Sequence, residues 1–225
     1  MKAADGAVHI TPLHGHAALL PQVRGWFAGE WPGWYGPGGP GDVEEDVAAM
    51  AASPDLLPLG LVAWRNGQAV GVGALKAQSI PSHAHLGPWA AAGYVAPALR
   101  GQGIGAALLA ALVAQAGRLG HARVYCGTRT AVSLLARCGW SVVEEVLHDG
   151  QPLTIFASDT PQPSYAPRCP LCGQANACAA SASGRFDVEC WCKQASFPPA
   201  LPAGVPADLA GRACICRACA EQAAG

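Results

Sequence analysis

The residues with the clearest chemical meaning form a short glycine-rich segment, Arg100-Gly-Gln-Gly-Ile-Gly105. The apolar residues 88–95 predict a strand before it, and the Ala/Leu-rich residues 104–119 predict a helix after it. The first N–H groups of such a helix have no carbonyl partner, so that end attracts anions. Its glycines let the backbone approach a phosphate closely, and Arg100 adds a fixed positive charge. The segment therefore predicts a pyrophosphate site.

Two other interpretations of this loop remain open. Gly-x-Gly-x-x-Ala at 101–106 fits a dinucleotide-binding loop, but that loop belongs to the first strand–helix unit and needs an acid about 20 positions later. Here at least two strands and two helices come first, and the next strand has no acid before Arg129. The glycines could also serve only as flexible residues at a helix start.

The remaining periodic segments predict an α/β domain around the loop. Asn-Gly at 66–67 and Asp-Gly at 149–150 predict tight hairpin turns, and Asp42 with Glu45 has the spacing of a capping box. We expect strands at 7–13, 59–64, 69–75, 88–96, 122–126, 140–147 and 153–157, and helices at 16–29, 42–52, 103–119 and 131–137.

The order of elements and the Arg-x-x-Gly-x-Gly loop resemble the GNAT superfamily of acyl-CoA N-acyltransferases over about residues 5–158. Residues 88–105, Glu30-Trp31, 125–128 and 138–140 carry the likeness. The resemblance implies a mixed α/β sheet, splayed at its centre and flanked by helices, and acetyl transfer from acetyl-CoA to a primary amine. It implies pantetheine contacts from the backbone of Tyr94 and Val95, and pyrophosphate contacts from Arg100, Gly101, Gln102, Gly103, Ile104, Gly105 and Ala106.

The general acid is the weakest part of the resemblance. The family's usual acid is a tyrosine in the helix before the last Gly-aromatic pair, and Leu135 stands at that position. Leucine cannot donate a proton. Ser133, Tyr94 and Cys126 are the candidates to protonate the departing thiolate, and release of the thiolate to solvent is the alternative.

The candidate base is Glu30, which lies among aromatic residues at 26, 31, 34 and 35. A carboxylate in such surroundings has a raised pKa and can accept a proton near neutral pH. It could equally bind a cationic substrate, or be a solvated charge at a helix end. His83 and His85 are either proton relays or surface histidines.

The cysteines mark a second domain. Eight of the ten lie at or after Cys169, whereas all seven histidines lie at or before His148. The proline-rich residues 159–167 separate the two parts, so we expect an acetyltransferase-like domain at 1–158, a linker at 159–167 and a cysteine-rich domain at 168–225.

Cys-x-x-Cys followed by glycine predicts a turn that directs two sulfurs at one metal ion. Eight thiols could supply two closed Cys₄ centres, which would make structural rather than catalytic zinc sites. Disulfides and an iron–sulfur cluster are the alternatives. The candidate ligands are Cys169, Cys172, Cys178, Cys190, Cys192, Cys214, Cys216 and Cys219.

The tail also resembles a small cysteine-rich family named for its Cys-Trp-Cys motif, over about residues 168–220. The likeness rests on the Cys-Pro-x-Cys-Gly turn, Asn176 with Cys178, Cys190-Trp-Cys192, and Cys214-Ile-Cys216. This resemblance implies an added module and no activity.

Composition excludes several partners. The formal net charge is −1 and the tail's charges nearly balance, which argues against nucleic acid and anionic membranes. The apolar runs are shorter than the roughly 20 residues of a spanning helix, and no signal peptide is recognisable, so we expect a cytoplasmic protein.

The expected acceptor is a small-molecule or peptide amine. A catalytically weakened acyl-CoA sensor or scaffold, with the tail as an interaction module, is the alternative function.

Overall fold

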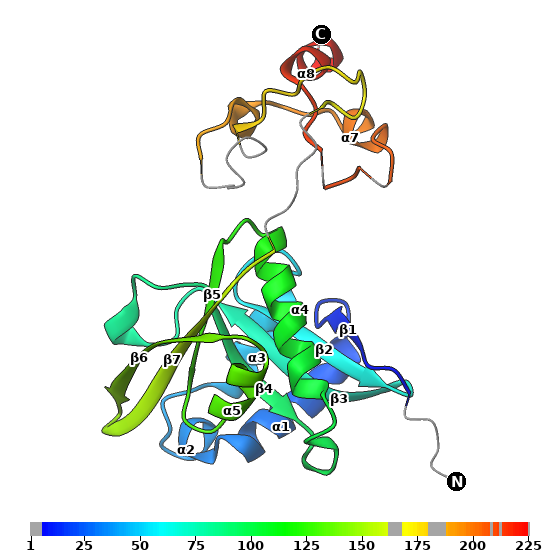
Figure 1. The fold of residues 1–225 in the computed structure, drawn as a ribbon. Coiled ribbons are helices and arrows are strands. Elements are labelled where there is room, and N and C mark those ends of the chain that lie inside the picture. Colours follow the sequence, from blue (N-terminus) through cyan, green and yellow to red (C-terminus); the bar gives the residue numbers. More distant parts are fainter. Residues whose placement is uncertain (1–5, 162–167, 180–187, 208, 212, 225) are drawn as a thin grey trace. The chain divides into compact units, whose positions relative to one another are not determined.

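The computed structural model describes residues 6–161, 168–179, 188–207, 209–211 and 213–224 (Figure 1). The chain divides into two compact units, residues 1–116 with 123–160 and residues 117–122 with 161–225. Asp159, which we expected to open the linker, is instead the last residue of a strand. Most of the expected linker, residues 162–167, lies outside the described residues.

The first unit is built on one seven-stranded mixed sheet in the order β1-β2-β3-β4-β5-β7-β6. Neighbouring strands are antiparallel except β4 and β5, which are parallel. The strands are β1 (His9–Pro12), β2 (Leu59–Arg65), β3 (Gln68–Lys76), β4 (Trp89–Val95), β5 (Arg123–Thr128), β6 (Ser141–His148) and β7 (Gln151–Asp159). The expected mixed α/β sheet is confirmed.

Both hairpins form at the dipeptides that predicted them. Asn66 and Gly67 have φ of 52° and 74°, and Asp149 and Gly150 have φ of 52° and 70°. Positive φ at both central residues is the type I′ geometry, whose twist matches that of paired strands. These turns fix the registers of β2 with β3 and of β6 with β7.

Helices cover both faces of the sheet (Figure 1). On one face, Leu108 and Leu112 of α4 pack on Gly71 and Gly73 of β3. A Cβ would lie 3.3 Å from the Leu108 methyl group at Gly71 and 3.1 Å from the Leu112 methyl group at Gly73. The other face carries α1 and α3, which pack on β4 and β2. The helices are α1 (Leu20–Glu30), α2 (Pro32–Tyr35), α3 (Val43–Ala52), α4 (Ile104–Arg118) and α5 (Val132–Arg137).

The expected helix at 16–29 differs in its first turn. Residues Ala17–Leu19 form a 3₁₀ turn, and α1 begins at Leu20 with a proline next in the chain. Proline fits the first turn because no N–H is needed there. Asp42 caps α3 as expected, with its Oδ1 accepting from the N–H groups of Glu44 and Glu45 at 2.8 and 3.0 Å.

The second unit has little regular structure. Its described helices are a 3₁₀ turn at Trp191–Gln194, α7 (Ala200–Ala203) and α8 (Arg217–Ala224). Among its side chains, Cys169, Cys178, Cys190 and Cys216 are buried, so cysteines supply much of its interior. In the part of the chain that the structure describes, no helix is long and apolar enough to cross a bilayer.

Candidate functional site

The glycine loop joins β4 to α4 as the sequence indicates. Gly101 and Gly103 have φ of 78° and 84°, a region that residues with a Cβ enter only at a cost. The N–H of Ala107 donates to the carbonyl of Gly103 at 3.0 Å, which is the first bond of α4. The N–H groups just before Ala107 therefore have no helical acceptor and can bind an anion.

The strand that leads into this loop separates from its neighbour. β4 and β5 pair at a single point, Trp89 with Tyr125, and no later pair joins these two described strands. β4 also bulges, because Ala92 and Gly93 together oppose only Gly73 of β3, and Ala92 has φ of 49°. A bulge bends its strand. The edge of β4 beyond Trp89 therefore presents backbone polar groups that a ligand lying along the strand can bond.

Arg100 and Glu30, which the sequence places in separate roles, form an ion pair. The Arg100 Nη2 lies 2.8 Å from Glu30 Oε2, and its Nε donates to the carbonyl of Val95 at 2.9 Å. Both side chains are partly exposed, so the pair contributes at most about 1 kcal/mol to stability. The guanidinium thus links the end of α1 to the end of β4 at the base of the loop.

Gln102, in the loop, is held by a residue that the sequence analysis missed. Arg65, the last residue of β2, is 8 % exposed and donates from Nη1 to Oε1 of Gln102. The Gln102 Nε2 in turn donates to the carbonyl of Ala98 at 3.4 Å. A charged residue before an Asn-Gly turn has the pattern of an ordinary strand end, so no local signal could have revealed this contact.

Tyr94 belongs to the core. It is 9 % exposed, and its ring stacks on Trp26 of α1 with centroids 5.0 Å apart. The Arg100 guanidinium carbon lies 5.8 Å from the centre of the same ring. Val95 pairs with Gly71 across β3 and β4, which leaves the other edge of the strand toward β5. Both residues lie on the part of β4 beyond Trp89, where no pair with β5 forms.

The candidate acids lie in different surroundings. Leu135 is 1 % exposed in the core, whereas Ser133 is exposed on the same helix, α5. Cys126 lies on β5, and burial raises its pKa to about 12, so its thiol keeps its proton at neutral pH. No described contact brings Ser133, Tyr94 and Cys126 together.

The two histidines before β4 lie away from the glycine loop. His83 Nε2 is 2.9 Å from Glu144 Oε1, its Nδ1 is 2.9 Å from Ser82 Oγ, and its ring packs on His85. The seven-residue β4 separates this cluster from the loop, a span of about 20 Å. His83 therefore has structural partners that explain it without a relay.

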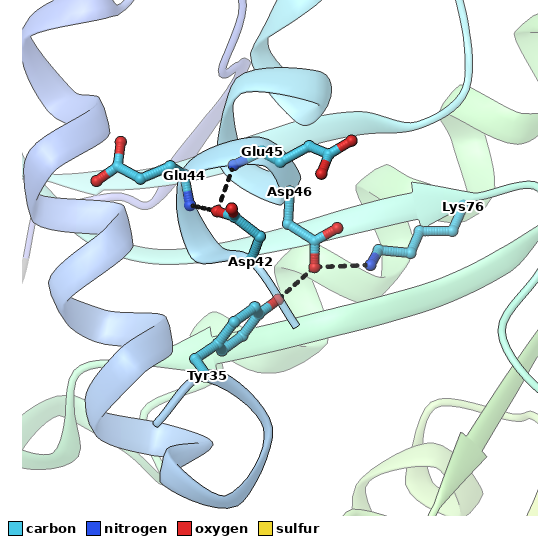
Figure 2. A network of polar contacts seen from close by, with 6 residues as sticks. All are labelled: Tyr35, Asp42, Glu44, Glu45, Asp46 and Lys76. Carbon is cyan, nitrogen blue, oxygen red and sulfur yellow. Dashed lines mark hydrogen bonds and ion pairs between the residues drawn. The ribbon is translucent and has the colours of Figure 1, made fainter. Parts of the chain in front are cut away.

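The aromatic residues that follow α1 are only partly exposed to solvent. Trp34 is 49 % exposed, whereas Tyr35 stacks on buried Phe27 with centroids 6.2 Å apart. Figure 2 shows the Tyr35 hydroxyl donating to Asp46 Oδ2 at 2.6 Å, with Lys76 Nζ 3.5 Å from the same oxygen. Burial, followed by the bond to Asp46, raises the pKa of Tyr35 well above its usual value. This network ties α2, α3 and β3 together.

A second cluster lies in the other unit. The Sγ atoms of Cys169, Cys172, Cys216 and Cys219 all lie within 4.8 Å of one another. The Cys-x-x-Cys turn is closed by the N–H of Gly173, which donates to the carbonyl of Cys169 at 2.9 Å. Gly173 has φ of 73°, which explains why a glycine follows the second cysteine.

These four sulfurs suit a tetrahedral thiolate centre. Ligands about 2.3 Å from one zinc ion lie about 3.8 Å apart. Here Cys172 and Cys216 are 3.6 Å apart, and Cys169 and Cys219 are 3.9 Å apart. Burial raises the pKa of Cys169, but hydrogen bonds from the backbone of Cys216, Cys172 and Leu171 outweigh it and lower that pKa to about 6. Such donors favour the thiolate form that binds metal.

The other four tail cysteines gather apart from this set. Cys178 and Cys190 are buried, and Cys192, Cys214 and Trp191 pack against them. All ten cysteines lie within the described residues, and none forms a disulfide.

Comparison with known proteins agrees with this architecture. The acetyltransferase (GNAT) family model matches residues 20–140, and the cysteine-rich CWC model matches residues 169–221. No curated protein matches the sequence closely enough to count as a relative. Among solved structures, aminoglycoside 6'-N-acetyltransferase of Enterococcus faecium has a TM-score of 0.56 at 17 % identity, with 69 % of this chain and 99 % of that chain covered.

Two further structures extend the comparison. An aminoglycoside 6'-N-acetyltransferase complexed with coenzyme A has a TM-score of 0.56 at 18 % identity over 69 % of this chain and 99 % of its own. Ribosomal-protein-alanine N-acetyltransferase of Brucella melitensis has a TM-score of 0.52 at 20 % identity over 68 % and 99 %. The fold of the first unit is that of these acetyltransferases. Because its family model covers more than half of the chain, this protein belongs to the GNAT family.

Proposed function

We propose that this protein transfers the acetyl group of acetyl-CoA to a primary amine of a small molecule or a peptide. The observation that carries the proposal is the glycine loop at the start of α4, next to the unpaired edge of β4. A pyrophosphate needs converging N–H donors, and an extended pantetheine arm needs a strand edge with free polar groups. The loop and the strand offer these two features side by side.

The residues of the loop would divide the binding between them. The backbone of Gly101, Gly103 and the first turn of α4, through Ile104, Gly105 and Ala106, would hold the pyrophosphate, while Tyr94 and Val95 would offer backbone bonds to pantetheine. Gln102 would set the loop's shape through its bond to buried Arg65. Arg100, already bonded to Val95 and Glu30, would hold the loop to α1 and supply positive charge.

In the reaction, the amine nitrogen attacks the thioester carbon, a C–N bond forms, and the C–S bond breaks to leave coenzyme A. The amine loses one proton and the departing sulfur gains one. Glu30 is the proposed base, because its ion pair with Arg100 holds its carboxylate beside the loop. Ser133 and Tyr94 remain candidates to protonate the sulfur. Holding the two reactants in contact lowers the activation barrier by several kcal/mol, even without either acid.

A second function has one observation in its favour. The position of the family's acid holds Leu135, which is buried and cannot donate a proton. A chain that binds acetyl-CoA but turns it over poorly would serve as an acyl-CoA sensor or scaffold. The two functions differ in one measurable respect, since only the enzyme releases coenzyme A faster when an amine is present.

The proposed class of acceptor rests on the amine that acetyl transfer requires and not on the shape of a binding pocket. The solved neighbours named above include enzymes for aminoglycosides and for a ribosomal-protein alanine, and both acceptors present an amine. We extend that class to this chain as a proposal, together with a cytoplasmic location, where acetyl-CoA is available. Zinc at Cys169, Cys172, Cys216 and Cys219 completes the proposal, and four thiolates leave no open position for catalysis.

The test begins with acetyl-CoA binding by calorimetry, comparing the wild type with Gly103→Glu. The added carboxylate would repel the pyrophosphate, so binding should be lost in the variant. A thiol-detecting assay with kanamycin and with an N-terminal alanine peptide then measures release of coenzyme A. Release above the no-amine rate supports the enzyme, and binding without release supports the sensor. No acetyl-CoA binding by the folded wild type would overturn both.

A further inference from the structure

The eight tail cysteines divide into two sets of four, a division that their sequence spacing cannot give. The outer set is Cys169, Cys172, Cys216 and Cys219, whose sulfurs are mutually within 4.8 Å. The inner set is Cys178, Cys190, Cys192 and Cys214, and all of its members lie between Cys172 and Cys216 in the chain. None of the inner cysteines belongs to the four-sulfur group found among the described residues.

Close sulfur contacts link the members of the inner set. Cys178 and Cys214 have their Sγ atoms 2.8 Å apart, and those of Cys190 and Cys192 are 3.2 Å apart. Cys178 and Cys190 belong to one buried cluster, and Cys192 and Cys214 pack against it, so the two pairs are neighbours. These distances exceed the S–S bond of about 2.05 Å, so the sulfurs are unbonded neighbours. They are also shorter than the 3.6 and 3.9 Å of the outer set. A zinc ion shared by all four sulfurs would lengthen these two contacts to about 3.8 Å.

The surroundings of the inner set suit a closed metal centre. The ring of Trp191, between two of the cysteines in the chain, packs against Cys178 and Cys190 and excludes water from them. Its indole N–H is buried and has no hydrogen-bond partner among the described residues. Metal-bound thiolates are commonly stabilised by such donors in their surroundings. The Arg217 guanidinium carbon lies 5.5 Å from the centre of this ring, and Arg217 follows Cys216 of the outer set.

We propose that the tail binds two zinc ions in nested Cys₄ centres, the outer one at Cys169, Cys172, Cys216 and Cys219 and the inner one at Cys178, Cys190, Cys192 and Cys214. The inner centre closes first along the chain, and the outer centre ties the two ends of the module together around it. Four soft donors in each centre favour zinc and leave no position for water, so both ions are structural. This inference is independent of the acetyl-transfer proposal.

The first measurement is the zinc content of the purified full chain, by native mass spectrometry against the denatured mass. Two zinc ions per chain and a fully reduced denatured mass are expected. One zinc ion, an iron–sulfur cluster, or a mass 2 Da lower from a disulfide would each overturn the proposal of two zinc centres. Cys138→Ser, outside the tail, is the matched control and should keep both ions.

Paired variants then test the division into sets. Cys178→Ser with Cys214→Ser removes two ligands of one centre, so one zinc ion should remain. Cys178→Ser with Cys216→Ser removes one ligand from each centre, so both ions should bind much more weakly. If the first pair lost both ions while the second kept one, the proposed sets would be wrong.

Variants of a small module can unfold, so the division is also measured on the wild-type chain. Limiting chelator followed by N-ethylmaleimide should expose the cysteines in two groups of four, with the membership given above. Peptide mass spectrometry identifies each group. Any other grouping, or labelling of all eight cysteines at one chelator concentration, would contradict two separate centres.

Discussion

Gly103→Ala should lower either the stability of the protein or its affinity for acetyl-CoA, without any steric clash. Gly103 has φ of 84°, and an added Cβ would meet nothing within 4 Å, so the substitution acts only through the backbone. Holding an alanine in the left-handed region costs about 1–2 kcal/mol. If the loop keeps its shape, this cost appears in the free energy of unfolding, and the melting temperature falls by about 2–8 °C. If the loop relaxes, binding must restore its shape, and acetyl-CoA binds about 5–30-fold more weakly.

The matched control is Gly25→Ala, an exposed glycine inside α1 with a negative φ and nothing within 4 Å of its added Cβ. There the same chemical change should raise stability by about 0.5–1 kcal/mol, because glycine is unfavourable inside a helix. Calorimetry of acetyl-CoA binding and thermal unfolding measure both variants. Wild-type affinity together with wild-type melting temperature in Gly103→Ala would refute the assigned role of the loop's backbone conformation.

Three further outcomes are expected. The pKa of Tyr35 is raised in the folded state, so its bond to Asp46 stabilises the protein fully below the unfolded pKa of about 10, and this stabilisation is lost as the pH rises further. The free energy of unfolding should therefore fall more steeply above pH 10 in the wild type than in Tyr35→Phe. Gln102→Ala removes an acceptor of buried Arg65 and should cost about 1–3 kcal/mol in urea unfolding, whereas an unchanged midpoint would show that this bond is dispensable. With its pKa raised to about 12, Cys126 should react slowly with iodoacetamide at pH 8 in the native chain and faster after unfolding, and rapid native labelling would contradict the raised pKa.

The parts of the fold that short sequence patterns predicted are those whose geometry depends on a few consecutive residues. Asn66-Gly67 and Asp149-Gly150 form the hairpin turns because both positions need positive φ. The glycine loop likewise needs positive φ at Gly101 and Gly103. The Asp42 cap depends only on a carboxylate two and three residues before the N–H groups that donate to it. The short helix α2 was missed because its four residues carry too little periodicity to be recognised.

Only the tertiary structure decided which distant residues meet. Glu30 and Arg100 are 70 positions apart, and Arg65 and Gln102 are 37 apart, yet each pair is in contact. Their side-chain types gave candidates for a base and for charge but no partner. The close approach of Cys169 and Cys219, 50 positions apart, likewise follows from the path of the chain.

The sequence by itself determined the loop that suits a pyrophosphate, the tight turns and the Cys-x-x-Cys-Gly knuckle, because backbone preferences and short spacing act within a few residues. The tertiary structure decided the bulge and early divergence of β4, the ion pair beneath the loop and the division of the cysteines. Those features depend on how strands and helices pack over long separations, where many pairings fit the same pattern of residue types and only burial of the common core selects one.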